Sequence, residues 1–149
     1  MRKKTILFVT GFVVFIVGFV IYDQMKYTTY GEIMEEWIGE EEIVEMKLHN
    51  TRKRAYDQLE GQEEQIVVES PEKMIDVIDE SSDMVMKRND EIPIWDYEIR
   101  LETKEGNEYV ITLGYDSAQM YDTQYEIPEE DNRLHKKVRA VFSNEVKDD

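Results

Sequence analysis

Residues 97–113 read YEIRLETKEGNEYVITL, and this stretch decides the expected fold. Apolar and charged side chains alternate from Tyr97 to Leu101, which predicts a strand with one buried face and one wet face. Residues 104–107, Lys-Glu-Gly-Asn, are typical of a tight turn, and the alternation resumes over 108–114. The stretch therefore predicts an antiparallel β-hairpin.

Upstream of this hairpin, the sequence predicts two more strands and a helix. Val44, Met46 and Leu48 alternate with polar residues, and a polar connection over 50–65 leads to the apolar run 66–68. Ser70 followed by Pro71 and Glu72 is a helix start, because the hydroxyl can cap a free amide and proline needs no donor in the first turn. The helix takes its apolar face from Met74, Ile75, Val77 and Ile78.

Downstream, we expect a short strand over 124–127 and a closing helix. Residues 128–131, Pro-Glu-Glu-Asp, open that helix, and acids at its start complement the helix dipole. Its apolar stripe consists of Leu134, Val138, Val141 and Phe142. The polar residues 87–90 are predicted to be a loop before the central hairpin.

The element order predicts an α+β fold, an antiparallel sheet of about five strands with two helices on one face, preceded by an N-terminal transmembrane helix. We divide the chain into a basic N-terminus (1–4), a transmembrane signal anchor (5–22), a juxtamembrane segment (23–42), an extracytoplasmic α+β domain (43–143) and a flexible tail (144–149).

The anchor is predicted from the 18 uncharged residues that run from Thr5 to Tyr22. Arg2, Lys3 and Lys4 precede it, so by the positive-inside rule the N-terminus is cytoplasmic and the domain is outside. The alternative is a cleaved signal peptide, which needs small residues at its cleavage site; residues 19–23, Phe-Val-Ile-Tyr-Asp, are bulky. We therefore expect a single-pass plasma-membrane protein.

The charge of the chain limits its partners. The 18 bases less the three at the N-terminus leave 15 against 34 acids, a net charge of −19 beyond residue 22. Such a surface repels phosphates, so we expect no nucleic-acid partner. The chain has no cysteine, which excludes disulfides and thiol chemistry.

The sequence contains no catalytic pattern, and we expect no cofactor and no metal site. His49 and His135 lack partners at triad or metal-ligand spacing, and both are expected to be ordinary exposed residues. Trp37 lies on a predicted amphipathic helix with Ile33, Met34 and Ile38. The possible partner surface consists of Trp37, of Arg52, Lys53 and Arg54 in the hairpin connection, and of Arg133, Lys136, Lys137 and Arg139 on the last helix. The alternative for both basic groups is an ordinary charged surface.

The pattern resembles a loose group of small uncharacterised envelope proteins of Gram-positive, Bacillus-like bacteria. The likeness rests on the first alternating strand, the Ser-Pro-Glu helix start, the Tyr97–Leu101 strand, the glycine hairpin and the closing Val-x-x-Val-Phe at 138–142. The resemblance implies a location and a fold, and no functional residue follows from it.

Three functions stay open at this point. The first is a non-enzymatic binding or accessory module that partners another envelope protein. The second is an envelope enzyme, such as a wall-modifying hydrolase, that uses carboxylates which sequence spacing does not identify. The third is a structural or regulatory subunit that acts through its transmembrane helix.

Overall fold

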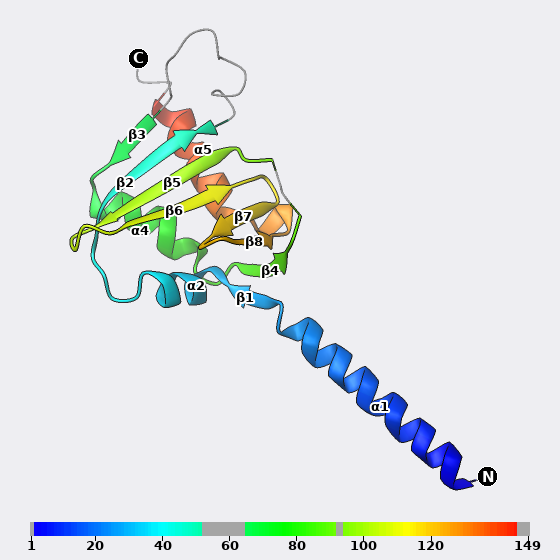
Figure 1. Ribbon diagram of the computed structural model, residues 1–149. Helices are drawn as coiled ribbons and strands as arrows, with labels where there is room; N and C mark the ends of the chain where they lie inside the picture. The colour runs from blue at the N-terminus through cyan, green and yellow to red at the C-terminus, as the bar shows by residue number, and fades with distance from the viewer. Residues whose placement is uncertain (1, 52–64, 92–93, 146–149) are drawn as a thin grey trace.

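The protein is built around one antiparallel sheet. The computed structural model describes residues 2–51, 65–91 and 94–145, with side chains over 10–51, 65–91 and 94–144. Eight strands of this part pair in the order β1-β4-β8-β7-β6-β5-β2-β3, where about five were expected (Figure 1). They are β1 (Tyr27–Thr29), β2 (Ile43–Asn50), β3 (Gln65–Val68), β4 (Val85–Asn89), β5 (Tyr97–Thr103), β6 (Glu108–Leu113), β7 (Ser117–Met120) and β8 (Thr123–Glu126).

The predicted central hairpin is confirmed as β5 and β6. Tyr97 pairs with Leu113 and Glu102 with Glu108 across the two strands. The turn closes through Gly106, whose φ of 84° lies in the left-handed region that glycine adopts without a Cβ penalty. Ile99 and Leu101 are fully buried, so this hairpin supplies the middle of the core.

The strand around Met46 is also confirmed, with one correction. β2 pairs with both β3 and β5, and Met46 and Leu48 are fully buried. Val44 was predicted on the same buried face but is 42% exposed. The register shifts between Ile43 and Glu45, and such a bulge turns the residue next to it away from its expected face.

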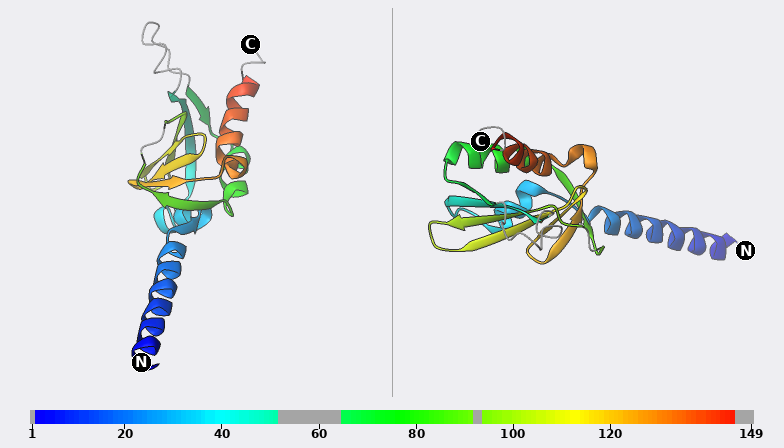
Figure 2. Two further views of the ribbon diagram at one scale, coloured as in Figure 1. Left: turned by 90° about the vertical axis from the view of Figure 1, so that its right-hand side faces the viewer. Right: turned by 90° about the horizontal axis from the view of Figure 1, so that it is seen from above.

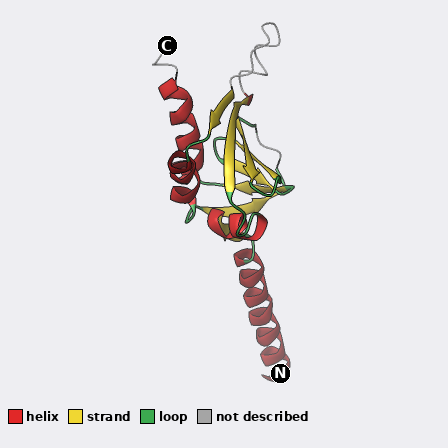
Figure 3. Cartoon of the chain, turned by 90° about the vertical axis from the view of Figure 1, so that its left-hand side faces the viewer, coloured by secondary structure: helices red, strands yellow, loops and turns green. Residues whose placement is uncertain are grey.

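Two helices cover one face of the sheet, as the edge-on views show (Figures 2 and 3). They are α4 (Pro71–Ile78) and α5 (Arg133–Glu145). Pro71 begins α4 as predicted, but Ser70 makes no side-chain capping bond. Leu134, Val138 and Phe142 bury the predicted stripe of α5 against the sheet. A 3-10 turn at Glu129–Asp131 precedes α5, so the acids do not occupy its first turn as expected.

A third helix, α2 (Tyr30–Trp37), lies at the end of the sheet near β1 and β4. A capping box starts it: the Glu32 amide donates to Thr29 Oγ1 at 3.3 Å, and the Thr29 amide donates to Glu32 Oε2 at 2.9 Å. The Glu32 carboxylate accepts from the Thr29 amide and the Thr28 hydroxyl, which lowers its pKa. Tyr30 and Ile33 are buried beneath the helix, so α2 is held at both its start and its inner face.

The prediction of a loop over 87–90 is wrong for residues 87–89, which belong to β4, while Asp90 follows the strand. β4 pairs with β1 and β8 and carries the fully buried Met86. β1 and β7 were also missed. All three strands are short, and β1 and β4 pair with strands far along the chain, so their context decides their conformation. β7 pairs with its sequence neighbours β6 and β8 but is only four residues long.

The predicted transmembrane anchor is wrong. α1 (Arg2–Gln24) projects away from the sheet (Figure 1), and its side chains are described from Thr10 onward. Within the part of the chain with described side chains, no helix combines the length and the apolar character needed to cross a bilayer, for which about 20 residues are required. The single-pass topology inferred from Arg2, Lys3 and Lys4, the plasma-membrane localisation and the function acting through a membrane helix lose their basis with it.

Candidate functional site

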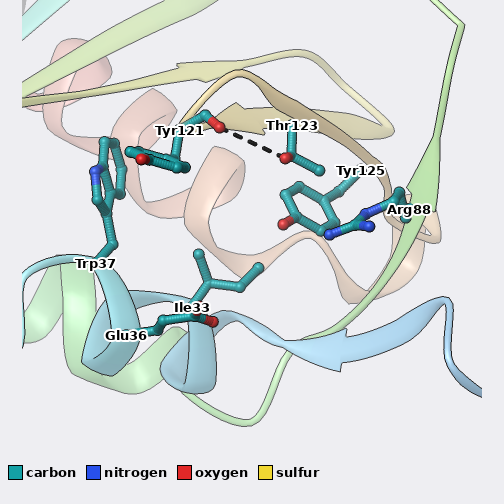
Figure 4. A pocket seen from close by; sticks show the side chains of 7 residues that line it. All are labelled: Ile33, Glu36, Trp37, Arg88, Tyr121, Thr123 and Tyr125. Atoms are coloured by element: carbon teal, nitrogen blue, oxygen red, sulfur yellow. Dashed lines mark hydrogen bonds between the residues drawn. The ribbon is translucent and has the colours of Figure 1, made fainter.

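A cleft opens between α2 and the β7–β8 hairpin. It has a volume of about 480 Å³. Figure 4 shows the side chains that line it converging from α2, β4, the hairpin turn and β8. They are Ile33, Glu36, Trp37, Arg88, Tyr121, Thr123 and Tyr125.

The α2 wall follows from helical spacing. Ile33 and Trp37 are four residues apart and therefore lie on one face of the helix, with Ile33 only 8% exposed. Glu36 is exposed beside them at the rim of the cleft. The capping box fixes the residue at which α2 begins. It therefore also fixes where Ile33, Glu36 and Trp37 lie relative to the sheet.

The opposite wall is a strained two-residue turn. Tyr121 and Asp122 join β7 to β8 with φ values of 47° and 58°. Two-residue hairpin turns need this left-handed backbone and favour glycine or asparagine, whereas a bulky residue such as tyrosine adopts it at a cost. The turn holds the Tyr121 ring 74% exposed at the mouth of the cleft.

Trp37 lies between two tyrosine rings. Its centroid is 6.2 Å from that of Tyr121, with the ring planes at 64°, and 5.2 Å from that of Tyr109, with the planes at 90°. The Tyr109 hydroxyl donates to Glu41 Oε1 at 3.1 Å. Desolvation first, and then this hydrogen bond, raise the pKa of Tyr109. Tyr109 therefore supports the indole, which lines the cleft together with Tyr121.

Glu41 holds the Tyr109 ring in place against Trp37. Besides Tyr109, its carboxylate accepts from the side-chain amide of Asn107 at 3.0 Å and from the Thr103 hydroxyl at 2.8 Å. Hydrogen bonds from Asn107 and then Thr103 are the main causes that lower its pKa. The segment that leaves α2 is thus tied to the tip of the β5–β6 hairpin.

Opposite charges lie at different ends of the cleft. Arg88 is directly across the ladder from Tyr125, and its side chain lies beside that ring, away from Glu36 and Trp37 (Figure 4). Arg88 is exposed on β4, while its backbone amide donates to Lys26 O at 2.8 Å. Neither the Glu36 carboxylate nor the Arg88 guanidinium makes a hydrogen bond or ion pair within residues 10–51, 65–91 and 94–144. Both charges are available to a ligand.

A second polar group lies in the core beneath α5. His135 Nε2 is 2.9 Å from Asp96 Oδ2, and the two side chains are 7% and 4% exposed. Asn132 accepts from the His135 amide at 3.1 Å and donates to the carbonyl oxygen of Gly114 at 3.2 Å. The expectation that His135 is exposed is therefore wrong; the pair fastens α5 to the start of β5.

The predicted partner surface is divided by the fold. Trp37 lies in the cleft. On α5, Lys137 pairs with Asp76 at 2.8 Å and Glu80 at 2.6 Å, Arg133 pairs with Asp83, and Lys136 Nζ donates to Glu130 O at 2.7 Å. Arg139 is exposed on the same helix. Arg52, Lys53 and Arg54 lie outside the described residues, as do the side chains of Arg2, Lys3 and Lys4.

Five of the residues that line the cleft were not identified from the sequence: Glu36, Arg88, Tyr121, Thr123 and Tyr125. Tyr121-Asp122 between two short alternating runs was a usable signal, since a two-residue connection defines a hairpin. The Tyr-Asp pair lacks the glycine or asparagine by which such turns are recognised, and Arg88 was assigned to a loop.

Comparison with protein-family models, with curated proteins and with solved structures finds no match to this chain. Within the part of the chain that the structure describes, no group of three or more histidine, aspartate or glutamate side chains could hold a metal ion. The site must therefore be interpreted from its own geometry.

Proposed function

We propose that this protein is a non-enzymatic binding module whose ligand occupies the cleft between α2 and the β7–β8 hairpin. The observation that carries the proposal is the left-handed backbone of Tyr121, which holds an aromatic ring exposed opposite Trp37. Strained residues concentrate at functional sites, because elsewhere a less costly residue would serve.

The size and lining of the cleft suit a small ligand. Ligand pockets span roughly 300–1,000 Å³ and combine apolar or aromatic walls with a few polar groups that orient the ligand. Here Ile33, Trp37, Tyr121 and Tyr125 supply the walls, within a volume of about 480 Å³. Glu36, Arg88 and Thr123 supply the polar groups.

The same lining favours binding over hydrolysis. Among the described residues that line the cleft, Glu36 is the one carboxylate. Glycoside hydrolysis normally uses two carboxyl groups that flank the scissile bond, one as acid and one as base or nucleophile. The His135–Asp96 pair is buried under α5 and does not line the cleft.

The proposal is tested by a fragment screen with full-length ¹⁵N-labelled protein. We expect hits that shift the Trp37 indole N–H signal together with the amides of Arg88 and Thr123. Tyr121→Asn keeps a left-handed turn and removes the ring, so it should weaken these hits about fivefold or more, as the loss of one aromatic contact implies.

Tyr27→Asn is the matched control, because Tyr27 is an exposed tyrosine on β1 that does not line the cleft. It should leave the affinities unchanged. Hits that shift only residues elsewhere, or affinities that Tyr121→Asn does not alter, would overturn the proposal.

A further inference from the structure

The charges of the cleft are arranged as a pair of opposite poles. Trp37, Tyr121 and Glu36 lie toward one end, and Arg88 lies beside Tyr125 at the other (Figure 4). From this arrangement we propose that the ligand is a small zwitterion of the phosphocholine type: a quaternary ammonium group at the Trp37 end and a phosphate at Arg88. This inference rests on the proposed function and names the chemistry of its ligand.

The aromatic end suits an organic cation. A cation within about 6 Å of a ring face is attracted by the ring quadrupole, most strongly by tryptophan. The rings of Trp37 and Tyr121 meet at 64° with centroids 6.2 Å apart, so they form two walls of a corner and not a closed stack. Glu36 adds a carboxylate at the rim. The net charge of −16 raises the local concentration of cations further.

A quaternary ammonium fits this corner better than a primary one. A primary ammonium brings three N–H donors that must each find an acceptor. The hydroxyl of Thr123 is already turned to the backbone oxygen of Tyr121, at 3.5 Å. Glu36 is the one carboxylate in the described part of the lining, so a cation without N–H donors leaves fewer hydrogen bonds unmade when it is desolvated.

The other end suits an anion. Arg88 presents a guanidinium whose fork geometry matches phosphate oxygens. Beyond it, Lys26 and Lys87 line an adjoining hollow of about 500 Å³ together with Arg88, and Asp90 and Glu126 line the same hollow. Lys26 is 3.7 Å from Asp23, and Lys87 Nζ lies 5.7 Å from the Tyr27 ring centroid, whereas Arg88 has no ion-pair partner in the described ranges.

A zwitterion satisfies both poles at once. A ligand with only a positive charge would lie near Arg88, which carries the same charge. A ligand with only a negative charge would lie near the Glu36 carboxylate, which repels it. A neutral sugar could stack on the rings but would pair with neither charge. Complementary placement of both signs is the usual basis of specificity at a polar site.

The test compares phosphocholine with 3,3-dimethylbutyl phosphate, which replaces the ammonium nitrogen by carbon and keeps the shape. Calorimetric titration of the full-length protein should show phosphocholine binding at least about fivefold more tightly, as a cation–π contact requires. Both ligands should shift the Trp37 indole signal.

Two substitutions test the cationic and the anionic end of the ligand separately. Glu36→Gln should weaken phosphocholine and leave the carbon isostere unchanged. Arg88→Gln should weaken both ligands, because both carry the phosphate. Both side chains are exposed, so unchanged thermal unfolding will show that the variants are folded.

A third arm uses phosphatidylcholine vesicles to distinguish a free ligand from a lipid head group. Binding of free phosphocholine supports the proposal whether or not vesicles also bind. Binding to vesicles alone, or equal affinity for phosphocholine and its carbon isostere, would overturn it. If other fragments still bind the cleft and lose affinity in Tyr121→Asn, the proposed function stands while the zwitterion fails.

Discussion

Replacing His135 with phenylalanine tests how α5 is fastened to the sheet. The imidazole is hydrogen-bonded to Asp96 at 2.9 Å, and its ring centroid lies 5.2 Å from that of Tyr97 and 5.7 Å from that of Tyr115. Phenylalanine keeps an aromatic ring for both neighbours. It removes the nitrogen that bonds to the carboxylate, so the substitution isolates the hydrogen bond from the packing.

The expected cost is large because both groups are buried. Asp96 is 3% exposed and His135 is 5% exposed, so water does not replace the lost partner. Removing this hydrogen bond from a buried carboxylate costs about 3 kcal/mol. In a domain of this size that corresponds to a fall in Tm of about 10 °C.

The assay is thermal and guanidinium unfolding followed by circular dichroism. His49→Phe is the matched control, because His49 lies on β2 and its Nε2 has no hydrogen-bond partner among the described residues. It should change the free energy of unfolding by less than about 0.5 kcal/mol. A loss below about 1 kcal/mol for His135→Phe, or equal losses for both variants, would show that the His135–Asp96 hydrogen bond does not hold α5 in place.

Three further predictions concern the frame of the cleft. Gly31→Ala should destabilise the protein by about 1–3 kcal/mol in guanidinium unfolding, because the new Cβ would lie 2.8 Å from the backbone oxygen of Ser82; no change would show that α2 shifts freely. Asp122→Gly should raise the free energy of unfolding by about 0.5 kcal/mol. Glycine adopts a φ of 58° without the strain that a Cβ brings, and this gain exceeds the extra backbone entropy that glycine loses on folding. A lower stability of the variant would contradict the strained turn. The hydrogen bond from Asn107 lowers the pKa of Glu41, so the ionised carboxylate stabilises the fold above its ordinary pKa of 4.5 and loses this effect as the pH falls through its lower folded pKa. Glu41→Gln should therefore flatten the decline of Tm between neutral and acid pH. Parallel Tm curves for the two proteins would contradict this role of Glu41.

The parts of the fold that alternate over long runs could be predicted from the sequence. The β5–β6 hairpin, the strand around Met46 and the stripe of α5 each repeat a buried pattern over enough residues to identify the element. β1, β4 and β7 are at most five residues long, too short for an alternating pattern to identify them. β1 and β4 also pair with strands far along the chain, and the sequence by itself does not display that pairing.

The cleft was partly predictable. Trp37 was identified from the amphipathic pattern of α2, but its ring contacts come from Tyr109 and Tyr121, more than 70 residues along the chain. The poles of the site also depend on the fold, since β4 and β8 bring Arg88 beside Tyr125. The basic residues of α5 stood out in an acidic sequence, yet in the fold Lys137 forms ion pairs with Asp76 and Glu80.

A crystallographic fragment soak of the full-length protein shows directly whether the cleft binds ligands. We expect ordered fragments to occupy the space between Trp37 and Arg88, with a ring or ammonium group against Trp37 and Tyr121. Fragments that gather at other surfaces while this cleft holds only water would contradict it.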